Sequence, residues 1–232
     1  IASTILRAKP NVGVFFTDDQ GTLDAGCYGA PHLKTSNIDQ LAETGVRFTQ
    51  AYAHTVCCPS RAMMMTGRHP QRGGVNHWTQ GNMNTPKGRN MALEELTMAE
   101  VFKREGYRTA LFGKWHLGAH QDHGPKKQGF DEFFGIRNGF IDNFNHHFLH
   151  QAGYHDLYEG TIPLKADGKF FPELMTHRAL RFIEESKDKP FFLYIPFNIP
   201  HYPEEAPEKF AEPFKDIKDE ATRSYATIMY AT

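Results

Sequence analysis

An α/β fold with a mostly parallel central sheet and helices on both faces is the architecture that this sequence predicts. The chain alternates apolar runs with segments of helical period, in the order 11–17, 36–45, 46–52, 57–66, 97–106, 109–112, 172–185 and 191–197. Continuous apolar runs are typical of strands covered on both faces, and their alternation with helices indicates parallel order. No internal repeat is evident, so we expect residues 1–232 to form one domain.

Composition bounds the class of protein. The 232 residues are 40% hydrophobic and 13% aromatic, which suffices for one sizeable core. A net charge of −1 excludes bulk attraction to nucleic acid or to a membrane surface, and no apolar run approaches a membrane span. An anionic substrate would therefore need a local cluster of positive groups. Three cysteines provide no disulfide framework.

The two ends of the chain suggest a processed or trimmed product. The first residue is Ile1 rather than Met, and no signal segment is present, although a removed secretory signal stays open. Residues 224–232 have the pattern of a helix that carries no stop signal.

The first predicted strand, 11–17, leads into Asp18 and Asp19. Open α/β sheets place ligands at the carboxyl ends of their strands, and paired carboxylates there suit Ca²⁺ or Mg²⁺. From the residues alone, a solvated Asp-Asp-Gln-Gly turn is the favoured alternative. A short amphipathic helix, 36–45, and an alternating strand, 46–52, then lead towards Cys57.

Residues 57–66 predict a helix that begins at a cysteine, with Pro59 in its first turn and Gly67 as its stop. Free backbone donors and the helix dipole would attract an anion towards Cys57. Two alternatives stay open on physical grounds, namely that Cys57 and Cys58 are buried small hydrophobes, or that they form a metal-thiolate site, although no second cysteine pair at zinc spacing exists.

Further signals follow in the second half of the chain. Residues 79–90 predict a polar loop, Thr97 and Glu100 a capping box, and 129–135 a turn-rich aromatic segment. Lys114 and His116 follow the strand 109–112, and alternation would send both side chains the same way. A loop then holds four histidines at irregular spacing: His146, His147, His150 and His155. We consider three roles for this loop: part of the pocket wall, a solvated loop and, less favoured, a zinc site.

The helix 172–185 and the buried strand 191–197 lead to Asn198-Ile199-Pro200-His201, and 201–213 follows as a surface loop. Three other motifs of the chain belong with this one, and the shortest of them is the Asp18-Asp19 pair. The two longer motifs are Cys57-x-Pro59-Ser60-Arg61, followed by Thr66-Gly67-Arg68, and Gly113-Lys114-Trp115-His116-Leu117-Gly118. From Pro10 to about Phe210 the chain resembles the type I, formylglycine-dependent sulfatases, arylsulfatase-like members of the alkaline-phosphatase superfamily.

The resemblance implies a sulfuric ester hydrolase acting on an aryl or carbohydrate sulfate. A formylglycine-generating enzyme would convert Cys57 to Cα-formylglycine, and Ca²⁺, with Mg²⁺ as the alternative, would bind Asp18, Asp19 and residue 57. The implied catalytic residues are Cys57, Arg61, Lys114, His116 and His201, with Lys114 and His201 on the sulfate. We assign His146 and His147 to the pocket wall that recognises the remainder of the substrate.

Two other functions stay open. One is a phosphonate or phosphate monoester hydrolase of the same superfamily, and the other is an inactive fragment that only binds sulfated ligands. The family also has a further metal pair and a second lysine downstream, which nothing from Tyr202 to Thr232 matches, so we expect a catalytic domain that is incomplete at its C-terminus. Family resemblance implies a periplasmic, secreted or lysosomal location. Neither the natural substrate nor the oligomeric state follows from the sequence.

Overall fold

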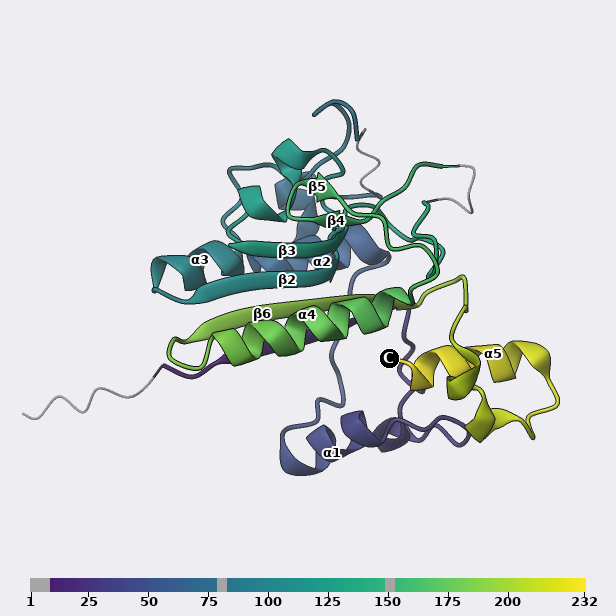
Figure 1. Ribbon diagram of the computed structural model, residues 1–232. Helices are drawn as coiled ribbons and strands as arrows, with labels where there is room; N and C mark the ends of the chain where they lie inside the picture. Colours follow the sequence, from purple (N-terminus) through teal and green to yellow (C-terminus); the bar gives the residue numbers. More distant parts are fainter. Residues whose placement is uncertain (1–8, 79–82, 149–152) are drawn as a thin grey trace, which may run out of the picture.

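The computed structural model describes residues 9–78, 83–148 and 153–232. Its centre is a six-stranded sheet in the order β1-β6-β2-β3-β4-β5 (Figure 1). The first four strands of that order are parallel to their neighbours and the last two are antiparallel: β1 (Val12–Asp18), β6 (Phe191–Pro200), β2 (Arg108–Lys114), β3 (Glu132–Ile136), β4 (Tyr158–Glu159) and β5 (Ile162–Pro163). The predicted mostly parallel sheet is confirmed.

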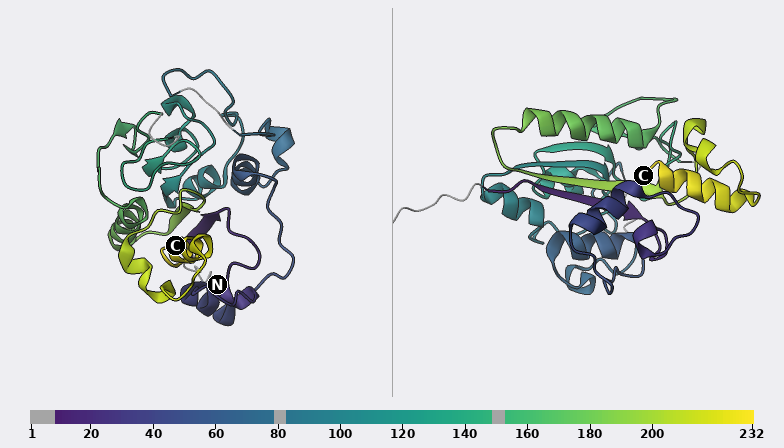
Figure 2. Two further views of the ribbon diagram at one scale, coloured as in Figure 1. Left: turned by 90° about the vertical axis from the view of Figure 1, so that its right-hand side faces the viewer. Right: turned by 90° about the horizontal axis from the view of Figure 1, so that it is seen from below.

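Helices cover both faces of the sheet, as predicted. Helix α4 (Phe171–Glu185) lies on one face, and α2 (Cys57–Thr66) and α3 (Met98–Arg104) lie on the other (Figure 2). Helices α1 (Ser36–Thr44) and α5 (Glu220–Tyr230) lie outside these two layers. Six short 3₁₀ helices complete the described structure: Gly26–Tyr28, Pro70–Gly73, Gln121–His123, Pro125–Lys127, Glu208–Phe210 and Glu212–Phe214.

Strand β6 divides the core into two parts because its side chains alternate between the faces. Leu193 and Ile195 belong to the cluster under α4, whereas Phe192 and Tyr194 belong to the cluster under α2 and α3. Every residue of β6 is buried. The sheet therefore holds the elements on its two faces in one body.

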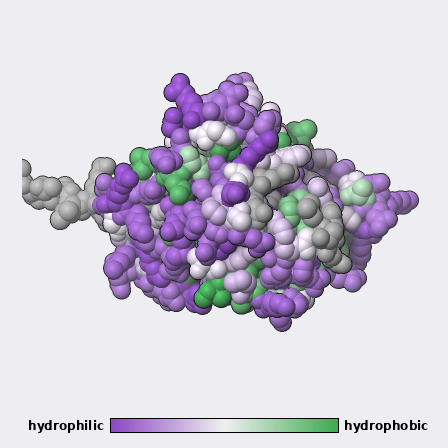
Figure 3. Space-filling view, turned by 90° about the horizontal axis from the view of Figure 1, so that it is seen from above, coloured by the Kyte–Doolittle hydropathy of each residue, from purple (hydrophilic) through white to green (hydrophobic). Residues whose placement is uncertain are grey.

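Seen from above, the molecule is largely hydrophilic, and its hydrophobic areas are separate patches (Figure 3). No helix in the described ranges is long and apolar enough to cross a membrane.

Local signals predicted the helix ends well. The Thr97 and Glu100 side chains form the predicted capping box at the start of α3. Gly67 ends α2 in the left-handed conformation, at φ 64°. The predicted helices 36–45 and 172–185 correspond to α1 and α4.

The predicted strand 46–52 is wrong. This segment forms no strand, and its apolar side chains are exposed, with Val46 at 81% and Tyr52 at 82%. Alternation produces a strand only where a neighbouring strand accepts its hydrogen bonds, and no described strand lies beside these residues. The predicted loop 79–90 has no helix or strand at 83–90, and 79–82 lies outside the described residues.

Two further expectations need correction. Strand β1 pairs only with β6 among the described strands, so it lies at an edge, and Phe15 is 66% exposed rather than buried. The segment 129–135, expected to be turn-rich, contains most of β3. Apolar content predicted the strand at β1, but position in the sheet decides how many of its faces are covered.

We predict that Gly113→Ala destabilises the protein severely. Gly113 has φ 143°, and a Cβ there would lie 2.0 Å from the carbonyl oxygen of Pro196. Strain and the backbone clash together should lower the free energy of unfolding by more than about 3 kcal/mol, measured by urea denaturation. Gly168→Ala is the matched control, because its φ is 77° but no atom lies near its Cβ position. That variant should lose only about 1–2 kcal/mol, and equal losses would contradict the role of the clash.

Candidate active site

The carboxyl ends of β1, β2 and β6 meet at one edge of the sheet. Asp18 ends β1, Lys114 ends β2, and His201 directly follows β6. The His201 amide donates to the Asp18 carbonyl at 2.9 Å, which joins the ends of β1 and β6. The topology thus brings together residues that lie up to 183 positions apart, from Asp18 to His201.

A buried ion cluster forms the base of this edge. The Lys114 ammonium donates to the Asp18 carboxylate, and Arg61 Nη2 lies 3.5 Å from Asp18 Oδ1. Arg61 also donates to the carbonyls of Lys114, at 3.0 Å, and Phe197, at 3.2 Å. Burial alone would raise the pKa of Asp18, but the Lys114 and Arg61 charges hold that pKa below its ordinary value. Arg61 and Lys114 therefore stabilise the packing of α2 against the strand ends, and neither lines the cavity in front of Cys57.

Cys57 occupies the first turn of α2. Val56 is the N-cap residue and offers no side-chain cap, so the helix N-terminus keeps donors and positive dipole available beside Cys57. The Ser60 hydroxyl accepts from the His54 amide at 3.0 Å and donates to the Val56 carbonyl at 2.9 Å. These bonds anchor the chain where it enters the helix.

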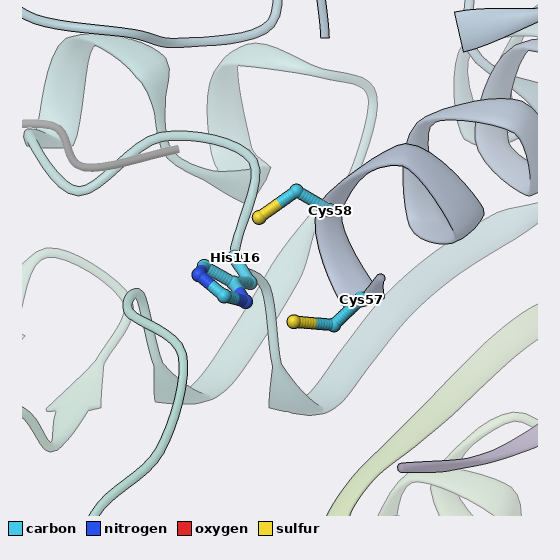
Figure 4. Close-up of side chains that lie close together, drawn as sticks. All are labelled: Cys57, Cys58 and His116. Atoms are coloured by element: carbon cyan, nitrogen blue, oxygen red, sulfur yellow. The ribbon is translucent and has the colours of Figure 1, made fainter. Parts of the chain in front are cut away.

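The side chains of Cys57, Cys58 and His116 point towards one another (Figure 4). Their potential ligand atoms all lie within 4.8 Å of one another. His116 has φ 56°, so the chain has already left the strand conformation there, and strand alternation does not explain its direction as predicted. Gly139 makes room for the ring, because a Cβ at that position would lie 2.6 Å from His116 Cε1.

Electrostatics favour a thiolate at Cys57. Hydrogen bonding to the Cys58 side chain, together with a His116 bond and the Lys114 charge, holds the pKa of Cys57 far below its ordinary value despite burial. Burial and the Lys114 charge also lower the pKa of His116. At neutral pH a negative group at position 57 faces a neutral imidazole.

A cavity of about 660 Å³ opens in front of these groups. Four predicted site residues line it, namely Asp19, Cys57, His116 and His201. Phe148 and Tyr154 also line it, and they belong to the loop predicted to form a pocket wall. The other lining residues were not predicted: Thr55, Val56, Trp78, Asn138, Gly139, Phe140 and Tyr202. The Asn138-Gly139 pair directly after an apolar strand is a turn signal that could have identified part of this wall.

His201 is held in a defined orientation. Its ring stacks on Phe140, with centroids 5.1 Å apart, and on Tyr202, at 4.6 Å. Its Nδ1 contacts the Tyr202 carbonyl at 2.7 Å, and because a carbonyl only accepts, Nδ1 carries the hydrogen. Nε2 lies 3.6 Å from Asp19 Oδ2. The Nε2 edge of the ring is therefore the one available to chemistry.

The structure does not bring His146 and His147 to this cavity. His146 is fully buried, and its Nε2 bonds to the Lys169 carbonyl at 3.0 Å. Neither residue is among those that line the described part of the cavity. Residue direction within a loop has no simple period, so the sequence could not show which histidines face inwards. His150 lies outside the described residues.

The carboxylates of Asp18 and Asp19 are suitable ligands for a divalent cation. Burial and the neighbouring Asp18 charge raise the pKa of Asp19, which a bound dication would reverse. Carboxylate oxygens are the ligands that Ca²⁺ and Mg²⁺ prefer. The Lys114 ammonium already neutralises part of the Asp18 charge, so Asp19 is the carboxylate that most needs a cation.

A second hollow, of about 750 Å³, lies away from this edge. It is lined by Gly26, Cys27, Asp39, Ala42, Glu43, Arg47 and Thr49. None of these is a predicted site residue, and this hollow lacks the buried lysine–arginine–carboxylate cluster found at the carboxyl ends of β1 and β2. We therefore place the candidate active site at the cavity beside Cys57.

Comparison of the whole chain with known proteins identifies its family. The family model described as Sulfatase matches residues 10–232. The chain belongs to the sulfatase family. Human arylsulfatase A is 35% identical over 257 residues, which covers 99% of this chain and 50% of the relative. Mouse arylsulfatase J is 32% identical over 235 residues, covering 98% and 38%. The chain thus spans half the length of these curated sulfatases or less.

Solved structures agree with this sulfatase assignment. Ps i-CgsB in complex with k-i-k-neocarrahexaose superposes with a TM-score of 0.86 at 30% identity, covering 96% of this chain and 52% of that structure. BT4656 in complex with its substrate D-glucosamine-2-N,6-O-disulfate gives 0.71 at 25% identity, covering 90% and 38%. The phosphonate monoester hydrolase of Agrobacterium radiobacter gives 0.58 at 20% identity, covering 89% and 44%, a likeness of fold alone.

We predict that iodoacetamide alkylates Cys57 of the unmodified, metal-free chain almost independently of pH between 8 and 6. The lowered pKa keeps the reactive thiolate populated as the pH falls. Cys27 is the internal control, since burial raises its pKa, and its rate should fall about 100-fold over the same two units. Peptide mass spectrometry follows both sites. Parallel losses at Cys57 and Cys27 would contradict the thiolate.

Proposed function

We propose that this chain provides the nucleophile-bearing part of a sulfuric ester hydrolase site that cleaves an aryl or carbohydrate sulfate. The observation that carries the proposal is the shared cavity of Cys57, His116, His201 and Asp19, which four separate sequence motifs contribute. Family membership supports the reaction class. The chain would need a formylglycine-generating enzyme as its maturation partner.

A sulfate monoester is a stable anion, so its hydrolysis needs three contributions. Its oxygens must be neutralised, a strong nucleophile must attack sulfur, and the leaving oxygen must receive a proton. The uncapped N-terminus of α2 and the Lys114 ammonium supply positive potential at this edge. Arg61 strengthens that potential from below while it holds the strand ends.

Conversion of Cys57 to formylglycine would supply, as the aldehyde hydrate, one hydroxyl for attack on sulfur and a second for release of sulfate. His116 is the base suited to residue 57, because its ring contacts that side chain and burial keeps it neutral. His201 is the acid suited to the leaving oxygen. The Nδ1 hydrogen is held by the Tyr202 carbonyl, so a proton that the ring takes up resides on Nε2, from which it can pass to the leaving oxygen in the cavity.

Asp18, Asp19 and residue 57 would hold a divalent cation. We propose Ca²⁺, with Mg²⁺ as the alternative, because adjacent carboxylates in a crowded site suit the larger and more flexible coordination shell of Ca²⁺. The ion would supply charge neutralisation beside the nucleophile. Asp19 is more exposed than Asp18 and is the better placed of the two for direct contact.

The cavity wall fits a planar or ring-shaped substrate. Trp78, Phe140, Phe148 and Tyr154 present aromatic surface, which can pack on an aryl group or on the apolar face of a sugar. The BT4656 and Ps i-CgsB structures, with their bound sugars, support the carbohydrate choice. We propose a sulfated glycan as the substrate class, and a secreted, periplasmic or lysosomal site of action.

We predict that activity depends on Cys57 and not on Cys58. Coexpression with a formylglycine-generating enzyme should lower the mass of residue 57 by roughly 18 Da before hydration, since the elements of H₂S leave and one oxygen enters. Cys57→Ala should abolish turnover of an aryl sulfate, whereas Cys58→Ala, the matched control, should retain most of it. Intact mass spectrometry and steady-state kinetics measure both effects. Wild-type turnover in Cys57→Ala would overturn the proposal.

The same assay tests the two alternative functions. Faster turnover of an aryl phosphate or phosphonate than of the matching aryl sulfate would favour a phosphate or phosphonate monoester hydrolase. An unmodified Cys57 in a protein that binds sulfated sugars without turnover would favour a binding fragment.

We predict that Asp19→Asn weakens Ca²⁺ binding at least about tenfold, because it removes a charged oxygen ligand while leaving the buried Asp18 cluster intact. Isothermal titration calorimetry measures the affinity. Asp216→Asn, an exposed change outside the candidate site, is the control and should leave binding unchanged. Equal Ca²⁺ affinities for wild type and Asp19→Asn would refute the assignment.

A further inference from the structure

Three potential metal ligands converge in the loop region next to the cavity wall. One ligand atom each from His146, His155 and Asp167 lies within 4.8 Å of the other two. Two residues that line the active-site cavity are close in the chain: Phe148 lies two residues after His146, and Tyr154 directly precedes His155. The cluster itself does not line the described cavity and plays no part in the proposed hydrolysis.

The fixed tautomer of His146 is the first argument for a ligand. His146 is 0% exposed, and its Nε2 bonds to the Lys169 carbonyl at 3.0 Å. Because the carbonyl accepts, Nε2 carries the hydrogen and Nδ1 of the neutral ring presents a lone pair. That buried Nδ1 has no hydrogen-bond partner among the described residues. A metal-bound histidine typically has this arrangement, with its second nitrogen donating to a backbone carbonyl.

The neighbouring rings repeat the pattern of unpartnered nitrogen atoms. Within the described ranges, His155 Nε2 and His147 Nδ1 are also buried without a hydrogen-bond partner. Ring centroids lie 6.0 Å apart for His146 and His155, and 5.3 Å apart for His147 and His155. Burial and the neighbouring His147 ring lower the pKa of His155, and burial lowers that of His146. Neutral imidazole is the form that binds metal.

The backbone holds His146 in this position. It has φ 63°, a conformation that a non-glycine residue adopts only when its surroundings require it. The Asp142 carboxylate accepts from the His147 amide at 2.8 Å, and the Asp156 amide donates to the His146 carbonyl at 2.8 Å. A hydrogen-bonded turn at 166–169 presents Asp167. The backbone that carries His146 and Asp167 is thus organised before any ion binds.

We propose that His146, His155 and Asp167 form a binding site for a divalent transition-metal ion of the Zn²⁺ type, which braces the wall of the active-site cavity. Two imidazoles and one carboxylate are a ligand set that Zn²⁺ commonly binds. Ca²⁺ prefers oxygen ligands, so a site with two nitrogen ligands does not favour it. Around a tetrahedral ion with bonds of 2.0–2.1 Å, two ligand atoms lie roughly 3.4 Å apart. The three ligand atoms here lie within 4.8 Å of one another, so side-chain rotations that bring them about an ångström closer complete the site. Exposed Asp167 has the freedom to make that movement.

The bracing follows from the connections of the loop. The Asp156 carboxylate, next to His155, accepts from the amides of Asn138 at 2.8 Å and Arg137 at 3.2 Å. Phe148 and Tyr154 stack with centroids 5.6 Å apart, and the Phe148 amide donates to the Tyr154 carbonyl at 3.0 Å. An ion bound by both His146 and His155 therefore links the two sides of the loop that carries Phe148 and Tyr154.

Zinc calorimetry on the metal-stripped chain tests the site. Measurements use a Cys57→Ala, Cys58→Ala background, because Cys57, Cys58 and His116 form the other described cluster able to bind Zn²⁺. The background should bind one equivalent with a Kd below about 10 μM. Asp167→Asn should weaken binding at least about tenfold and His155→Gln more strongly. His177→Gln, at an exposed histidine of α4, is the matched control and should change nothing.

Hydrogen exchange separates bracing from simple binding. Zn²⁺ should slow amide exchange at Phe148 in the background protein and leave it unchanged in His155→Gln. Circular dichroism confirms that each variant folds. Failure of the background to bind Zn²⁺ at 100 μM, or equal affinities for the background and His155→Gln, would overturn the proposal. Neither outcome bears on sulfate hydrolysis, since the background lacks the nucleophile.

Discussion

The buried contact of Asp18 with Lys114 and Arg61 is the interaction on which the site depends. It joins the ends of β1 and β2 to the helix that carries Cys57, and the two Arg61 hydrogen bonds to backbone carbonyls extend it to β6. Removing one partner of such a buried pair costs about 3–5 kcal/mol, because the other charge remains unpaired. The cluster therefore serves as structural foundation and as a source of positive potential.

A layered arrangement follows from that cluster. The buried charges lie at the base, and the groups able to react lie above them in the cavity: Asp19, Cys57, His116 and His201. The lowered pKa of Cys57 depends on both layers, since Cys58 and His116 bond to it and Lys114 acts through charge. The aromatic wall completes the site, and the histidine cluster at 146–167 supports that wall.

Local chemistry explains which sequence predictions succeeded. Capping at Thr97, the stop at Gly67 and the helix at Cys57 each depend on residues within one or two turns, and the structure has all three. The strand at 46–52 failed because a strand also needs a partner, and β1 was expected to be buried because an apolar run does not show how many neighbours it has. Pairing is a long-range property, so no local pattern contains it.

The sequence by itself determined the family and the fold class, because spacing and residue type within short motifs suffice for these. Only the tertiary structure decided which side chains face the cavity. It turned His146 inwards to the Lys169 carbonyl, and it brought Phe140 and Tyr202 against His201. Side-chain direction in loops depends on contacts between distant segments, and those contacts exist only once the sheet has assembled.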